Sequence, residues 1–157
     1  MLAFSVKIIA AEPYGKNLKN RFGDLCAEAT SLHMRQPYSV LGALFGMPVA
    51  AALDVTRNRK RSTFERSIDL MRSIAGRNSV DGSYERFELA IMMLFQPAGW
   101  TEEGARLFEV PVNGQTASQD VGRYRLFDCA SGGEWSEIDL LEAVRRIFLD
   151  RNPHLTI

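Results

Sequence analysis

Acidic residues near the carboxyl end are the first group whose types and spacing could do chemistry. Fifteen consecutive positions hold five carboxylates: Asp128, Glu134, Glu137, Asp139 and Glu142. Two carboxylates in one cleft can act as general acid and base if their environments separate their pKa values. Glu137 and Asp139, however, follow Ser136 at the start of an expected helix, where acids stabilise the helix end. We therefore expect structural or solvated roles for these acids.

A thiol and an imidazole form the second candidate. Cys26 and His33 share one face of an expected helix, but two helical turns separate them by about 10 Å along the axis. A nucleophile and its base must lie within hydrogen-bond reach. The chain holds two Cys and two His in all, without the spacing of a zinc site. The sequence therefore predicts no cysteine nucleophile, no metal site and no cofactor.

A helix-turn-helix is the third candidate. Residues 38–55 have its apolar spacing, with Gly46 as the turn glycine. The basic run that follows, residues 57–61, could bind phosphates. The expected recognition helix, 48–54, offers no Arg, Asn or Gln to a base edge. Nucleic-acid binding stays an alternative, with a solvated charged loop as the other interpretation of the run. Its basic residues are Arg57, Arg59, Lys60 and Arg61.

Charge is distributed unevenly along a chain whose total is zero. Residues 57–77 carry seven basic and two acidic residues, a net +5, and residues 78–157 carry seven basic and thirteen acidic residues, a net −6. Such asymmetry can mark a site for a charged partner, or the two segments can attract each other within the fold. If a basic partner binds the acidic half, it needs acids that the fold does not use. We expect these to be Glu102, Glu103, Asp120 and Glu134, with Trp100 and Trp135 as the apolar alternative.

Recognisable catalytic motifs do not occur. The sequence contains no phosphate-binding glycine loop, no dinucleotide fingerprint and no GxSxG elbow, which argues against an enzyme without excluding a motif-less site. The leading hypothesis is a small non-catalytic binding protein of the inhibitor or immunity type that engages another, basic protein. A nucleic-acid-binding regulator using residues 38–77 and an enzyme are the alternatives, and homo-oligomerisation is left open.

The elements that would position these residues follow from apolar periodicity. Alternation over 2–10 predicts a strand, as do the apolar residues of 107–112 and 121–129. Helical spacing predicts helices over 17–32, 37–46, 48–53, 64–75, 87–95 and 136–150. Because these strands do not alternate with helices, we expect an α+β fold in which several helices pack on a small, mostly antiparallel sheet.

Length and composition bound this fold. The 157 residues, 46% hydrophobic and 24% charged, predict a single globular domain over 1–157 and exclude a disordered or collagen-like chain. The uncharged run 36–53 contains Pro and Gly and is expected in the core, not in a membrane. Lys7 interrupts the first apolar stretch, and two distant cysteines suit a reducing compartment, so we expect a cytoplasmic protein.

Overall fold

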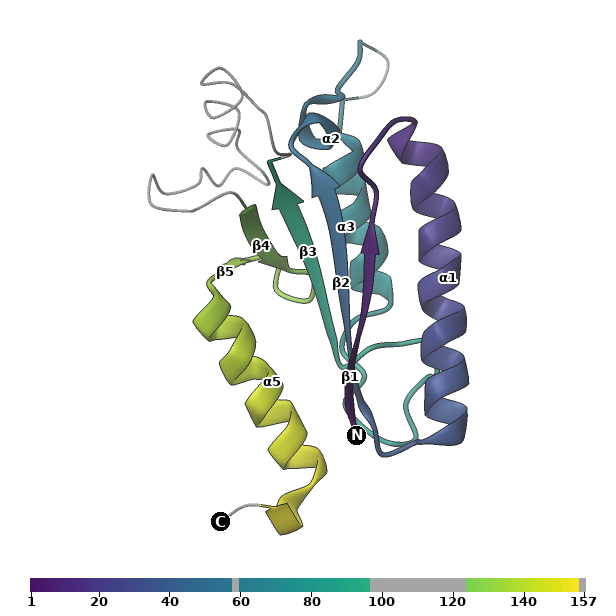
Figure 1. The fold of residues 1–157 in the computed structure, drawn as a ribbon, viewed down its shortest axis with the longest axis vertical. Helices are drawn as coiled ribbons and strands as arrows, with labels where there is room; N and C mark the ends of the chain where they lie inside the picture. Colours follow the sequence, from purple (N-terminus) through teal and green to yellow (C-terminus); the bar gives the residue numbers. More distant parts are fainter. Residues whose placement is uncertain (58–59, 97–123, 156–157) are drawn as a thin grey trace.

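A mixed sheet is the centre of the computed structural model, which describes residues 1–57, 60–96 and 124–155. The strands of this described part follow their chain order across the sheet (Figure 1). They are β1 (Leu2–Ile8), β2 (Val40–Pro48), β3 (Leu89–Phe95), β4 (Tyr124–Asp128) and β5 (Glu134–Trp135). β1, β2 and β3 are parallel, and β3–β4 and β4–β5 pair antiparallel.

The α+β class predicted from the sequence is confirmed, but the mostly antiparallel sheet is wrong. Helices do connect the parallel strands: α1 (Tyr14–Arg35) lies between β1 and β2, and α2 (Ala50–Leu53) and α3 (Thr63–Ser73) lie between β2 and β3. A parallel connection needs such a crossover. After β4 and β5 the chain continues into α5 (Glu137–Arg151) and a short 3-10 helix, Pro153–Leu155.

Two predicted helices are strands in the structure, and for this reason the prediction of a mostly antiparallel sheet is wrong. The helices expected over 37–46 and 87–95 are β2 and β3, the two inner strands of the parallel part. A strand buried on both faces is apolar at nearly every position, so it shows no alternation. Such a run also satisfies helical spacing, and periodicity alone cannot separate the two. The helix-turn-helix geometry of residues 38–55 is wrong for the same reason.

A glycine in β2 allows a side chain of β1 to approach the β2 backbone closely. Gly42 is paired with Phe4 of β1, and a Cβ atom at Gly42 would clash with the Phe4 ring. The Phe4 side chain therefore lies across the backbone of β2. Glycine within a strand often marks such a contact.

Other predicted elements are confirmed. β1 lies within the expected strand 2–10, and β4 lies within 121–129. α3 and α5 begin at capping boxes, in which the side chains of Ser62 and Ser136 accept from the backbone N–H three residues on. Gly76 follows α3 with φ of +79°, a conformation that favours glycine. The expected strand 107–112 lies outside the described residues.

The two faces of the sheet are covered differently. One face packs against α1, α2 and α3 in the main core, which includes Phe45, Met92 and Phe127. The other face packs against α5 at β2, β3 and β4, through Ile91, Leu126 and partners such as Leu44 and Val144. Figure 1 shows α1 beside β1 and α5 on the other side of the strands.

The side of helix α5 that points away from the sheet carries exposed apolar side chains. Ile138 and Leu141 were expected to be buried by the last helix, but each is 67% exposed. The stripe that packs instead includes Leu140, Ala143, Val144 and Ile147. The prediction is therefore wrong for Ile138 and Leu141, which lie outside the stripe of α5 that packs on the sheet.

We predict that Leu94→Ala lowers the free energy of unfolding by about 2–5 kcal/mol, because Leu94 is fully buried and its removal leaves a cavity. Leu141→Ala is the matched control on the exposed side of α5 and should change stability by less than about 0.5 kcal/mol. Chemical denaturation of both variants measures the difference. Equal, small effects would contradict the placement of β3 in the core.

Candidate functional site

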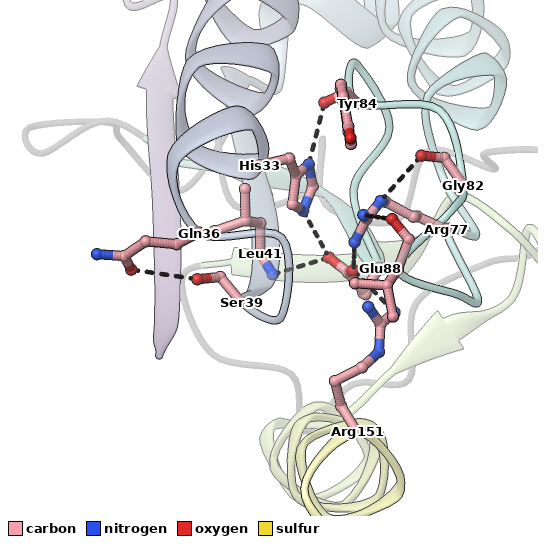
Figure 2. Close-up of polar contacts among 10 residues, drawn as sticks. His33, Gln36, Ser39, Leu41, Arg77, Gly82, Tyr84, Glu88 and Arg151 are labelled. Atoms are coloured by element: carbon pink, nitrogen blue, oxygen red, sulfur yellow. Dashed lines mark hydrogen bonds and ion pairs between the residues drawn. The ribbon is translucent and has the colours of Figure 1, made fainter.

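A buried carboxylate at the start of β3 gathers polar groups from several elements (Figure 2). The Glu88 side chain is fully buried. Its Oε1 accepts hydrogen bonds from Arg77 Nη1 at 2.7 Å and from Arg151 Nη2 at 3.0 Å. Its Oε2 accepts from the backbone N–H of Leu41 in β2 at 2.9 Å. One carboxylate thus joins β2, β3, the segment after α3 and the end of α5.

His33, in the last turn of α1, is the fourth partner of Glu88. Its Nδ1 lies 3.0 Å from the Tyr84 carbonyl oxygen, so Nδ1 carries the hydrogen and donates. Its Nε2 lies 3.4 Å from Glu88 Oε2 but makes no hydrogen bond within the described residues. The His33 imidazole therefore lies next to the Glu88 carboxylate without a hydrogen bond to it. This contact places the end of α1 in the same cluster.

Arg77 uses its remaining donors to hold the loop before β3. Nη2 donates to the Val80 carbonyl at 2.6 Å and Nε donates to the Gly82 carbonyl at 3.4 Å. The backbone N–H of Arg77 also donates to the Phe87 carbonyl at 2.9 Å. The fork of the guanidinium therefore fixes both the loop and the carboxylate.

The chemistry that this cluster can perform follows from its burial. His33, Arg77 and Glu88 have side chains with no exposed surface, so a substrate cannot reach the imidazole or the carboxylate. The cluster acts as a clamp between elements. The cluster meets a cavity of about 250 Å³ at Arg77, Glu88 and Arg151, next to the end of α5.

Sequence reasoning missed this cluster. Arg77 was counted with the basic segment, and His33 was placed at the edge of an apolar stripe. The available signal was Glu88, a single acid inside an otherwise apolar stretch, because buried acids are almost always paired. The identity of its partners depends on contacts across eleven and sixty-three positions of sequence, which no local pattern shows.

A second candidate surface is the free edge of the sheet at β1. β1 pairs only with β2 among the described strands. The Met1 carbonyl and the Ile9 N–H bond to β2, so odd-numbered residues point their backbone groups inward. By alternation, the even-numbered residues point theirs outward. These residues also have exposed apolar side chains: Leu2, Phe4, Val6 and Ile8, 40–51% exposed.

A groove runs between this edge and α1. Its volume is about 310 Å³, and its walls include Ala3, Leu32, Leu41 and Phe87. At its rim, Glu28 of α1 accepts hydrogen bonds from Ser5 and Lys7 of β1. Charged side chains, Lys above all, usually block an exposed edge, but Lys7 is held against α1 by this ion pair. The edge is therefore apolar along its exposed row, while its α1 side combines apolar walls with polar groups such as Ser5 and Glu28.

The acids expected to bind a basic partner are only partly described. Glu134 is half-buried in β5 and accepts two hydrogen bonds from Arg125, at 2.9 and 2.8 Å. Its predicted free, exposed loop position is wrong, because the buried Arg125 guanidinium needs a counterion. Trp135 is half-buried against α5. Their part in partner binding stays a prediction, and Glu102, Glu103, Asp120 and Trp100 lie outside the described residues.

Other acids of the second half serve the local structure, as the sequence suggested. Asp139 closes the capping box with Ser136, and Tyr124 donates to Glu137. Asp128 accepts from the backbone N–H groups of Ala130 and Ser131. In the described part of the chain, the negative charge of this half is therefore largely engaged within the fold.

The basic run is partly described. Arg57, Lys60 and Arg61 are exposed, and Arg61 is ion-paired with Asp69 of α3; Arg59 lies outside the described residues. Since residues 40–48 form a strand, no helix-turn-helix precedes the run. Phosphate binding by these residues stays a prediction.

The thiols are poorly suited to nucleophilic chemistry. Burial raises the pKa of the Cys129 thiol to about 12, and burial also raises the pKa of Cys26. Both are free, and both remain protonated at neutral pH. Within residues 1–57, 60–96 and 124–155, no three His, Cys, Asp or Glu side chains gather as metal ligands would. In the same ranges, no helix has the length and apolar character needed to cross a bilayer.

Comparison of the chain with protein-family models, with characterised proteins and with solved structures finds no match. The argument for function therefore rests on the site geometry alone.

We predict that Glu88→Gln lowers the free energy of unfolding by about 3–5 kcal/mol, because it leaves the buried Arg77 guanidinium without its counterion. Glu142→Gln makes the same chemical change at an exposed position of α5 and should have little effect. Urea denaturation of the two variants measures the difference. A loss for Glu88→Gln no larger than that of the control would show that the cluster does not hold the fold together.

The attachment of β1 to α1 should weaken in acid. Burial acts to raise the pKa of Glu28, but hydrogen bonds from Lys7 and Ser5 outweigh it and hold the pKa below its usual value. A lowered folded-state pKa gives stability that is present above the unfolded-state pKa, about 4.3, and is lost as pH falls through the folded-state pKa.

Glu28→Gln should therefore be less stable than the natural protein near neutral pH, and the difference should shrink as pH falls below about 4. Denaturation at a series of pH values measures it, with Glu85→Gln, exposed before β3, as control. A difference that is constant with pH would show that the ion pair with Lys7 contributes nothing to folding.

Proposed function

We propose that this chain is a non-catalytic, cytoplasmic binding protein that receives an extended segment of another protein along the free edge of β1. The observation that carries the proposal is the coincidence, at Leu2, Phe4, Val6 and Ile8, of outward backbone groups and exposed apolar side chains. A peptide added as a strand gains main-chain hydrogen bonds from such an edge and specificity from the pockets beside it.

The shape of the edge defines the segment that would fit. One face of an added strand would meet the exposed apolar row of β1, and the other would meet the groove against α1, whose walls include Ser5 and Glu28. A segment with apolar residues at alternating positions, all on the face toward that row, matches these surfaces. Such binding of a segment of a target protein is in keeping with an inhibitor or immunity-type role.

The opposite edge of the sheet makes β1 the better docking position. β5 has two residues, which is one of the ways natural proteins protect an edge. β1 has seven residues, no proline and its one charged side chain engaged with Glu28. The β5 edge is thus short, whereas the β1 edge is long and apolar. We therefore place the partner segment at β1.

The test is a pair of substitutions at Val6. Val6→Pro removes one outward N–H while leaving the bonds from β1 to β2 intact, and proline is tolerated on the outer side of an edge strand. Val6→Ala shortens the side chain further than proline does but keeps the N–H, so it controls for the loss of side-chain contact. Short random peptides displayed on phage are selected on the natural protein, and affinities of the selected peptides are measured by fluorescence anisotropy.

We expect selected peptides to carry apolar residues at alternating positions and to bind Val6→Pro about tenfold or more weakly than Val6→Ala, which corresponds to ~1.4 kcal/mol. Equal affinities for the two variants, or no selected peptide, would overturn the proposal. Sedimentation analysis provides the other outcome: a natural protein that dimerises while Val6→Pro is monomeric would show that a second copy, not a partner protein, occupies the edge.

A further inference from the structure

A small cavity beside the Glu88 cluster lies away from β1 and has no part in the proposed function. It has a volume of about 250 Å³ and lies where the segment after α3, the start of β3 and the end of α5 meet. Its polar wall comprises Arg77, Asn78, Glu88, Asp150 and Arg151. The volume is below the range typical for drug-sized ligands, so it suits a molecule of only a few heavy atoms.

Arg151 provides the first sign of a ligand. Its side chain is only 10% exposed. Nη2 donates to Glu88, but Nη1 is buried and has no hydrogen-bond partner within the described residues. Buried side-chain donors nearly always have a partner, and an exception calls for an explanation. The Arg151 Nη1 atom is a charged donor that is ready for an acceptor.

The charge of the cluster is the second sign. Glu88 is the one carboxylate that contacts both Arg77 and Arg151, so one negative charge faces two guanidinium groups. Asp150 also lines the cavity, but it forms no ion pair with either arginine in the described structure. The two guanidinium groups therefore share one carboxylate in direct contact, and not every guanidinium N–H has an acidic partner.

The geometry points to a site for a small oxyanion, a carboxylate or a phosphate group, in this cavity. Arg151 Nη1 would donate to one oxygen of the anion, and the amide of Asn78, an exposed residue that also lines the cavity, would supply a second donor. Guanidinium groups bind planar or tetrahedral oxyanions strongly because their N–H groups form a fork. The Asp150 carboxylate on the wall favours an anion with a single charge over a more highly charged one.

The experiment follows backbone and side-chain amides of the ¹⁵N-labelled protein by NMR during separate titrations with acetate and with inorganic phosphate. We expect saturable shifts confined to Gly76, Asn78 and the end of α5. Saturation with acetate alone assigns the site to carboxylates, and saturation with phosphate alone assigns it to phosphate groups. No saturable change with either anion, or shifts centred elsewhere, would overturn the proposal.

Substitutions identify the donors. Arg151→Met should weaken binding at least tenfold, whereas Arg145→Met, which removes the same charge from an exposed position of the same helix, should bind as the natural protein does. Since Arg151 also contacts Glu88, its variant can lose stability. Asn78→Ala, with Ser79→Ala as its control, tests the second proposed donor at an exposed position. Unchanged affinity in both Arg151→Met and Asn78→Ala would contradict the assignment, as would equal losses in the controls.

Discussion

The buried carboxylate of Glu88 is the constraint on which the arrangement of this molecule depends. A charge removed from water must be paired and hydrogen-bonded, or it does not stay ionised. Glu88 meets that demand with Arg77, Arg151, the Leu41 N–H and an approach from His33. Each partner comes from a different part of the chain. The pairing therefore sets the position of α1 and α5 against the sheet, which apolar packing alone would leave less specific.

Anchoring α5 at Arg151 has a consequence for both candidate sites. The helix is held at its end beside the start of β3, and its apolar stripe covers β3 and β4. It does not extend over β1, whose apolar row stays exposed. Arg151 also lines a cavity, and its Nη1 has no hydrogen-bond partner among the described residues. The open edge and the oxyanion site are thus two results of one helix position.

The sequence predicted those elements whose signals are local. Alternation identified β1, apolar residues identified the β4 region, and Ser136 and Asp139, expected at the start of the last helix, form a capping box there. It failed for β2 and β3, because a strand buried on both faces has no period to detect. It also failed for Glu88, Arg77 and Glu134, whose partners are set by tertiary contacts. Charge counts include Glu88 and Arg77 without their partners and leave Glu134 as an exposed acid, whereas the structure pairs Glu88 with Arg77 and Glu134 with Arg125.

A short chain of contacts joins the cavity to the β1 groove: Arg151 bonds to Glu88, Glu88 accepts from the Leu41 N–H, and the Leu41 side chain lines the groove. Contiguity of this kind is not coupling, which requires an element with two arrangements that both sites bias. Glu88 Oε1 is shared by two arginines, and its Oε2 accepts from the backbone N–H of Leu41 near the start of β2. Moving either oxygen of Glu88 would leave a buried charged group without its hydrogen-bond partner. The cluster is therefore a rigid support between the two sites, and each site recognises its ligand on its own.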